Sequence, residues 1–128
     1  MIGLEEALGI HREVVSATGG SQGVRDMGGL EAALARPYAT FGGEDLYPDA
    51  IGKAAAILES IVKNHPFVDG NKRTGYLLMR LVLRTYDMDV RERDDAEYDL
   101  VIQVATGQLD ADGVRSWLEP RVKPVPSR

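Results

Sequence analysis

The stretch HPFVDGNKRT, residues 65–74, separates two helical segments of different character in this 128-residue chain. Before it, apolar residues recur at helical spacing and predict an amphipathic helix from about Asp49 to Asn64. Pro66 disfavours helical geometry at His65, so we expect this helix to end there and to continue as a loop. After it, residues 76–83 are apolar around almost the whole circumference of a helix, which is typical of a buried central helix.

The second half of the same stretch has the composition of an anion site. Gly70 can adopt a positive φ and lets a ligand approach the backbone closely. Asn71 is a favourable N-cap, which would leave the free N–H groups of the next turn pointing into the loop. Lys72 and Arg73 stand in that turn, where cations oppose the helix dipole unless an anion compensates them. These features predict a phosphate cradle.

His65 and Asp69 add reactive groups to this cradle. A histidine titrates near neutral pH and can take a proton from an attacking hydroxyl. A carboxylate beside a polyphosphate commonly holds Mg²⁺, a cation that prefers oxygen ligands. A base, a metal ligand and an anion cradle are the parts that phosphoryl or nucleotidyl transfer needs, and the residues alone leave both reactions open.

The rest of the chain is predicted to be helical, with one irregular segment. Helical spacing of apolar residues begins near Leu4 and stops at Gly19, and Asp110 would cap a last helix. Residues 38–48 break the pattern and suit an extended flap or small hairpin. We therefore expect an all-α fold class, a compact helical bundle around one buried central helix. We expect a single domain over residues 1–128, with its core at about 4–119 and a loose tail at 120–128.

The composition excludes several classes of protein. The chain has no cysteine, which removes disulfides, thiolate zinc sites and cysteine nucleophiles. It has no apolar run long enough to span a membrane and no secretory signal at its start, so we expect a cytoplasmic protein. The net charge of −5 argues against nucleic-acid binding. That average conceals a net +4 over residues 60–84 against −9 for the remainder, which places a cationic centre in an acidic shell.

Three polar residues outside the central stretch are interpreted as structural. His11 falls on the apolar face of the first helix and is predicted to be a core histidine with its hydrogen bonds satisfied. Arg80 and Arg84 lie one turn apart on the apolar helix. We expect them to pair with acidic residues of the 87–99 region rather than with a ligand.

The central stretch resembles the signature of the Fic/Doc family, His-x-Phe-x-(Asp/Glu)-(Gly/Ala)-Asn-(Gly/Lys)-Arg. Every defined position matches, namely His65, Phe67, Asp69, Gly70, Asn71, Lys72 and Arg73. The resemblance covers about residues 4–119. Adenylyltransferases of the family usually have Gly at the position of Lys72 and a second Arg at the position of Tyr76. In both respects this chain instead resembles the Doc (death-on-curing) branch. That branch implies phosphate transfer from ATP to a hydroxyl of elongation factor Tu, which stops translation, and neutralisation by a Phd-like antitoxin.

The resemblance also implies a role for each matched residue. His65 would be the general base and Asp69 the Mg²⁺ ligand, while the backbone of Gly70 and Asn71 would form the anion hole. Lys72 and Arg73 would grip the phosphates of ATP. Phe67 would anchor the loop in the core, and the flap at 38–48 would align the backbone of the target protein. The alternatives are adenylyl transfer at the same site and a catalytically silent Fic-like binding module.

Overall fold

The computed structural model describes residues 1–91 and 94–126, and this part of the chain is mainly helical. The α-helices are α1 (Leu4–Thr18), α2 (Met27–Ala35), α3 (Ala50–Asn64), α4 (Asn71–Arg84), α5 (Asp94–Ala105) and α6 (Ala111–Leu118). A short 3₁₀ helix, η1 (Arg36–Tyr38), extends α2. The strands are β1 (Thr40–Phe41), β2 (Glu44–Asp45), β3 (Met88–Val90) and β4 (Val122–Pro124). The predicted all-α fold class is confirmed.

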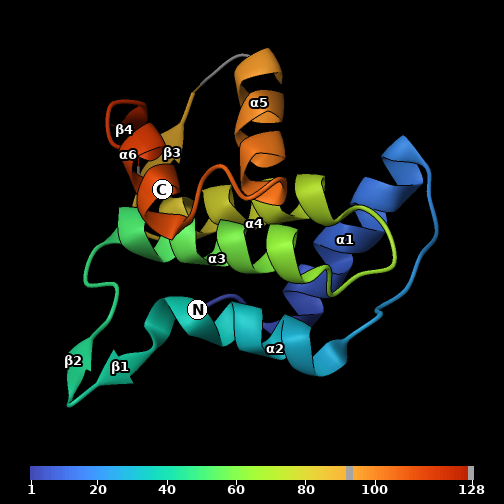
Figure 1. The fold of residues 1–128 in the computed structure, drawn as a ribbon, viewed down its shortest axis with the longest axis horizontal. Coiled ribbons are helices and arrows are strands. Elements are labelled where there is room, and N and C mark those ends of the chain that lie inside the picture. The colour runs from blue at the N-terminus through green and yellow to red at the C-terminus, as the bar shows by residue number, and fades with distance from the viewer. Residues whose placement is uncertain (92–93, 127–128) are drawn as a thin grey trace.

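Helices α3 and α4 run side by side through the middle of the molecule (Figure 1). Helix α2 lies on one side of this pair, α5 and α6 on the other, and α1 against α4. The sequence predicted a single central helix at residues 71–84, whereas α3 is buried over more of its surface than α4. The small side chains of Ala54, Ala55 and Ala56 allow neighbours to approach α3 closely, while charged residues keep one face of α4 at the surface.

Aspartate side chains begin three of the helices. Asp26, Asp49 and Asp110 accept a hydrogen bond from the backbone N–H three residues later, at the starts of α2, α3 and α6. Each such cap satisfies an N–H group that the helix itself leaves unpaired and stabilises the fold by about 1 kcal/mol. The capping role predicted for Asp110 is confirmed.

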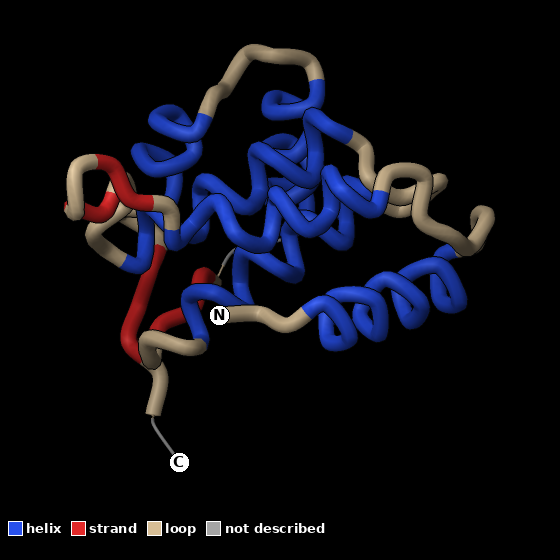
Figure 2. Tube along the Cα trace, turned by 90° about the horizontal axis from the view of Figure 1, so that it is seen from below, coloured by secondary structure: helices blue, strands red, loops and turns tan. Residues whose placement is uncertain are grey.

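The predicted flap is a small hairpin that projects from the body of the molecule (Figure 1). Strands β1 and β2 pair antiparallel, and the two turn residues Gly42 and Gly43 both have positive φ, as a two-residue hairpin turn requires. The hairpin precedes α3, and the loop at residues 65–70 follows it. Since 15 residues of helix span about 22 Å, the hairpin and that loop lie at opposite ends of the molecule (Figures 1 and 2). The role in aligning the backbone of the target protein, which the resemblance implies for this flap, stays a prediction.

The chain after Pro120 is more ordered than the sequence indicated. Strand β4 pairs antiparallel with β3, and the N–H of Val125 donates to the carbonyl of Asp87. The expectation of a loose tail at 120–128 was therefore wrong for residues 122–125. A strand of three residues that ends in proline has no strand pattern of its own in the sequence, and it is ordered by pairing with β3, which is distant in sequence. Residues 127 and 128 lie outside the described part of the chain.

Candidate active site

The candidate site lies where α3 ends and α4 begins, in a motif loop formed by residues 65–70. His65 ends α3 in the left-handed conformation (φ 50°, ψ 59°), so the predicted end of that helix is confirmed. Gly70 has a positive φ of 80°, as predicted. A Cβ added at Gly70 would lie 3.2 Å from the Val15 side chain, so both its conformation and its surroundings favour glycine.

Asn71 is the first residue of α4 and does not cap it, which corrects the sequence prediction. Gly70 occupies the N-cap position, and no side chain in the described part of the chain caps the helix there. The buried Asn71 side chain instead accepts from the N–H of Phe67 and donates to the carbonyl of Phe67, both at 3.0 Å. Its amide thus closes the motif loop from inside, and the N–H groups at the start of α4 remain without a side-chain acceptor at the N-cap.

His11 and Phe67 fasten the motif loop to the core. Phe67 is fully buried, as the family resemblance implied, and the His11 ring stacks on it at a centroid distance of 3.8 Å. His11 Nε2 lies 2.7 Å from the carbonyl oxygen of Asp69, to which its N–H donates. The prediction of a satisfied core histidine is confirmed. No pattern in the sequence indicates that this residue holds the loop that carries Asp69.

A second segment, the clamp loop formed by residues 20–26, runs antiparallel to the motif loop and pairs with it. Ser21 N–H donates to Asp69 Oδ2 at 2.8 Å, and the N–H of Val68 donates to the carbonyl of Gly23 at 3.0 Å. Further along, Val24 and Phe67 form an isolated β-bridge, and the N–H groups of Arg25 and Asp26 donate to the carbonyl of Pro66 at 2.7 and 3.0 Å. The backbone of the motif loop is therefore fixed almost residue by residue.

The predicted reactive side chains face solvent around this rigid loop. His65, Asp69, Lys72 and Arg73 are all exposed. Within residues 1–91 and 94–126, neither Lys72 nor Arg73 forms a salt bridge. The histidine thus stands at the end of α3 and the carboxylate in the loop that follows, while the two cations, without a salt bridge to any described residue, stand at the start of α4, where the helix dipole adds further positive potential.

The arginines of the last turns of α4 are paired, as predicted. Arg80 and Arg84 both donate to the carboxylate of Asp89, with N···O distances of 2.8–3.0 Å. Burial of Asp89, which is 2% exposed, opposes its ionisation, but the hydrogen bonds from Arg80 and from the Val90 N–H outweigh burial and lower the pKa of the carboxyl.

A cavity of about 440 Å³ lies between α4 and α5, beside the start of α4. Lys72, Arg73 and Tyr76 line it from α4, and Glu97 and Tyr98 line it from α5. Burial and, after it, the Glu97 carboxylate raise the pKa of Tyr76, so its phenol stays neutral at physiological pH. The cavity is in the size range of small-molecule sites and combines apolar walls with a few polar groups.

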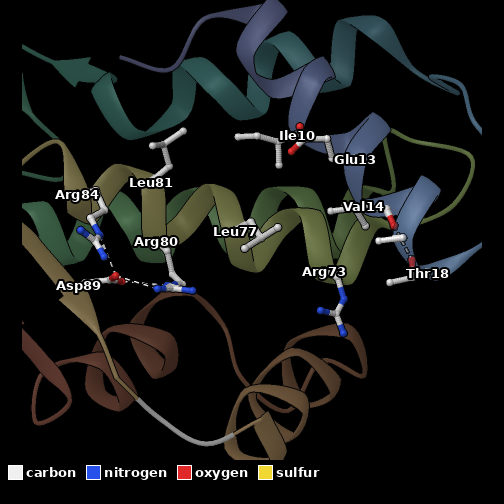
Figure 3. Close-up of a pocket in the computed structure, with 11 residues that line it drawn as sticks. Ile10, Glu13, Val14, Thr18, Arg73, Leu77, Arg80, Leu81, Arg84 and Asp89 are labelled. Carbon is white, nitrogen blue, oxygen red and sulfur yellow. Dashed lines mark hydrogen bonds and ion pairs between the residues drawn. The ribbon is translucent and has the colours of Figure 1, made fainter.

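A groove of about 400 Å³ lies on the other side of α4, against α1 (Figure 3). Ile10 and Val14 of α1 and Leu77 and Leu81 of α4 form its apolar lining. Arg73 borders this groove as well as the cavity beside α5, so whatever fills the groove would lie next to the cationic start of α4.

The residues of the site fit a polyphosphate and can supply one ligand to a divalent cation. In the described part of the chain, no three His, Asp or Glu side chains are grouped so that they could hold a metal ion by themselves. Asp69 would therefore act as the single protein carboxylate. Phosphate oxygens and water can complete the coordination of a Mg²⁺ ion held in this way.

No helix within the described residues is long and apolar enough to cross a membrane.

Comparison with known proteins agrees with this architecture and site. A sequence model of the Fic/DOC family matches residues 2–83. Toxin Doc of Mycolicibacterium smegmatis is 46% identical over 108 residues, which cover 80% of each chain. Protein kinase doc of Escherichia phage P1 is 31% identical over 114 residues, which cover 89% of each chain. The chain belongs to the Fic/DOC family, and both relatives lie on its Doc branch.

Proposed function

We propose that this protein is the toxin of a toxin–antitoxin pair and acts in the cytoplasm as a protein kinase. It would transfer phosphate from ATP to a hydroxyl of a translation factor, elongation factor Tu by family resemblance. The observation that carries the proposal is the start of α4, where Lys72 and Arg73 are exposed and form no ion pair with any described residue, after the loop that carries His65 and Asp69. Cations at that end of a helix are unfavourable unless an anion binds there.

The polyphosphate of ATP fits the start of α4. Its uncapped N–H groups, Lys72 and Arg73 converge there, and Gly70 keeps the backbone open to a close approach. The adjoining cavity between α4 and α5 has room for the nucleoside, with the Tyr76 phenol and the Glu97 carboxylate as its polar groups. Lys72 supports the kinase reaction over adenylyl transfer by its resemblance to the Doc branch.

Asp69 fits Mg²⁺ because its carboxylate has a fixed position. Ser21 N–H holds Oδ2, and a Cβ at Gly20 would lie 3.1 Å from the Cβ of Asp69, so the clamp loop packs closely against this side chain. A Mg²⁺ ion bound there would neutralise charge on the transferring phosphate.

His65 would act as the general base. The exposed imidazole takes the proton from the acceptor hydroxyl as its oxygen forms a bond to the γ-phosphorus, and the bond to the β-phosphate oxygen breaks to release ADP. Lys72, Arg73 and the N–H groups of α4 stabilise the negative charge on the phosphates. Because this chemistry depends mainly on positioning, the rigid motif loop matters as much as the base itself.

The proposal is tested with ATP labelled on either the α or the γ phosphate, incubated with a cell extract and the purified protein. Label from the γ position on a protein acceptor, lost in His65→Ala, is the expected result. Label from the α position would show adenylyl transfer instead. No transfer of either label by folded protein free of antitoxin would leave only the silent binding module.

The partner is proposed to be a Phd-like antitoxin that inhibits by binding the toxin. The groove between α1 and α4 offers it an apolar surface next to Arg73, and the acidic shell of the protein suits a basic segment. Expression of the protein alone should arrest bacterial growth, and Asp69→Ala should relieve the arrest. Equal toxicity of the variant and the parent protein would contradict metal-assisted chemistry.

A further inference from the structure

Arg25 is tied to His65 through the end of α3, although 40 residues separate the two in sequence. Arg25 Nε donates to the carbonyl of His65 at 2.7 Å, and its Nη2 donates to the carbonyl of Asn64 at 2.6 Å. Its backbone N–H also donates to the carbonyl of Pro66 at 2.7 Å. One residue of the clamp loop therefore holds three successive carbonyl groups, at residues 64, 65 and 66.

The conformation of His65 makes these contacts consequential. Within residues 1–91 and 94–126, the non-glycine residues with positive φ are His65 and Asp87, and L-residues rarely adopt this conformation. Pro66 disfavours the ordinary helical conformation at His65 but by itself favours an extended one. The N–H of His65 still donates to the carbonyl of Ile61 at 3.3 Å, as in a helix that ends with a left-handed residue. A further interaction is needed to select this conformation over the extended one.

The guanidinium of Arg25 supplies that interaction. The last carbonyls of a helix have no partner within the helix and carry its partial negative charge, so a cation with two parallel donors suits them well. With His65 in the left-handed conformation, the carbonyls of residues 64 and 65 lie within reach of the same planar group. Since the imidazole extends from the same Cα whose φ and ψ are fixed in this way, the contact also sets the direction of the Cα–Cβ bond from which the ring extends.

We propose that Arg25 is a positioning residue, which holds His65 in the left-handed conformation from which its imidazole reaches the acceptor hydroxyl. This inference rests on the proposed role of His65 as the base. Two of the five guanidinium N–H donors of Arg25, on Nε and Nη2, are committed to backbone carbonyls at the end of α3, so we assign this side chain to the loop rather than to the phosphates. It therefore acts on the rate of proton transfer and leaves the binding of ATP at the start of α4 unchanged.

The test compares Arg25→Ala and Arg25→Lys with Arg12→Ala, which removes an exposed arginine of α1 that has no salt bridge in the described residues. Four quantities are measured: kcat for γ-phosphate transfer, the stoichiometry and the Kd of ATP binding by calorimetry, and the one-bond Cα–Hα coupling of His65 by NMR, which differs between positive and negative φ. Arg25→Ala should lower kcat roughly 10- to 100-fold, as expected for a misplaced catalytic group.

In the same variant, the stoichiometry and Kd of ATP binding should stay at wild-type values, and the coupling of His65 should lose its positive-φ signature. Arg25→Lys keeps the charge but not the paired donors, so its kcat should be intermediate. Arg12→Ala should match the wild type. A loss of kcat that only parallels a loss of ATP-binding sites would indicate unfolding and would overturn the proposal. A wild-type kcat and an unchanged His65 coupling in Arg25→Ala would overturn it too.

The experiment separates this inference from the proposed function. If the wild-type protein transfers no phosphate, the proposed function fails on that measurement alone. The NMR comparison of the wild type with Arg25→Ala still decides whether Arg25 sets the conformation of His65, because it requires no turnover.

Discussion

The two ends of α4 carry the same type of charge in opposite circumstances. At its C-terminal end, Arg80 and Arg84 suit the helix dipole and share the buried carboxylate of Asp89 (Figure 3). At its start, Lys72 and Arg73 oppose the dipole and form no salt bridge with any described residue. Basic residues that the fold itself neutralises are structural, whereas basic residues left uncompensated at an unfavourable place indicate a binding site. Substitutions at the two ends should therefore act on different properties.

Asp89→Asn should have the largest effect, and the effect should fall on stability. The variant leaves two guanidinium groups without their shared carboxylate, which we expect to cost about 2–3 kcal/mol, below the range for fully buried pairs because both arginines are partly exposed. Urea unfolding at neutral pH measures the loss. Asp87→Asn is the matched control, because Asp87 is exposed and asparagine tolerates its positive φ. Equal unfolding midpoints for the two variants would contradict a structural role for the Asp89 cluster.

Arg73→Ala should reduce phosphate transfer and ATP affinity by about 10-fold or more, because it removes a charge-assisted contact to the nucleotide. Its unfolding midpoint should not fall, because a cation in the first turn of α4 opposes the helix dipole. Arg84→Ala, at the other end of the helix, should have the opposite effects: it should lower the unfolding midpoint and leave the Kd for ATP unchanged. If both variants bind ATP equally well, the start of α4 is not the phosphate site.

Acid should weaken the C-terminal end of α4 selectively. The pKa of Asp89 is lowered in the folded protein, so its stabilising effect is complete above the ordinary aspartate pKa of about 3.9 and is lost as pH falls through the folded value. The stability difference between the wild type and Asp89→Asn should therefore shrink below about pH 4. This stability difference is measured by thermal unfolding of both proteins between neutral pH and pH 2. A difference that stays constant over this range would contradict the linkage.

Asp49 should show the same behaviour on a smaller scale. Hydrogen bonds from Arg115 lower its pKa to about 2, so most of its contribution is lost between about pH 4 and pH 2 and the rest below pH 2. Both partners are partly exposed, and we expect the pair to contribute less than about 1 kcal/mol. Arg115→Ala should therefore lower the thermal midpoint slightly at neutral pH and by much less at pH 2.

Local signals allowed much of the site to be predicted. The proline after His65, the glycine at position 70 and the cations that follow act within one or two turns, and the structure bears out the helix end, the positive φ and the exposed charges. Pairing between distant segments leaves no such signal. The contact of Ser21 with Asp69 joins residues 48 positions apart, and no periodicity in either segment points to it. Asn71 shows a subtler limit, since a side chain suited to an N-cap made two equally good hydrogen bonds with Phe67 instead.

Lys72→Ala should have the smallest effect on stability, and its sign is the most informative. Removing a cation from the first turn of α4 relieves an unfavourable interaction with the helix dipole, and alanine is a strong helix former. We therefore expect the free energy of unfolding to rise by about 0.3–1 kcal/mol in low salt, while phosphate transfer falls. The gain should fade as salt is added, because the charge is exposed. A variant that loses both activity and stability would show that Lys72 supports the fold. A variant that loses activity but gains stability would show that Lys72 serves the ligand although it destabilises the helix.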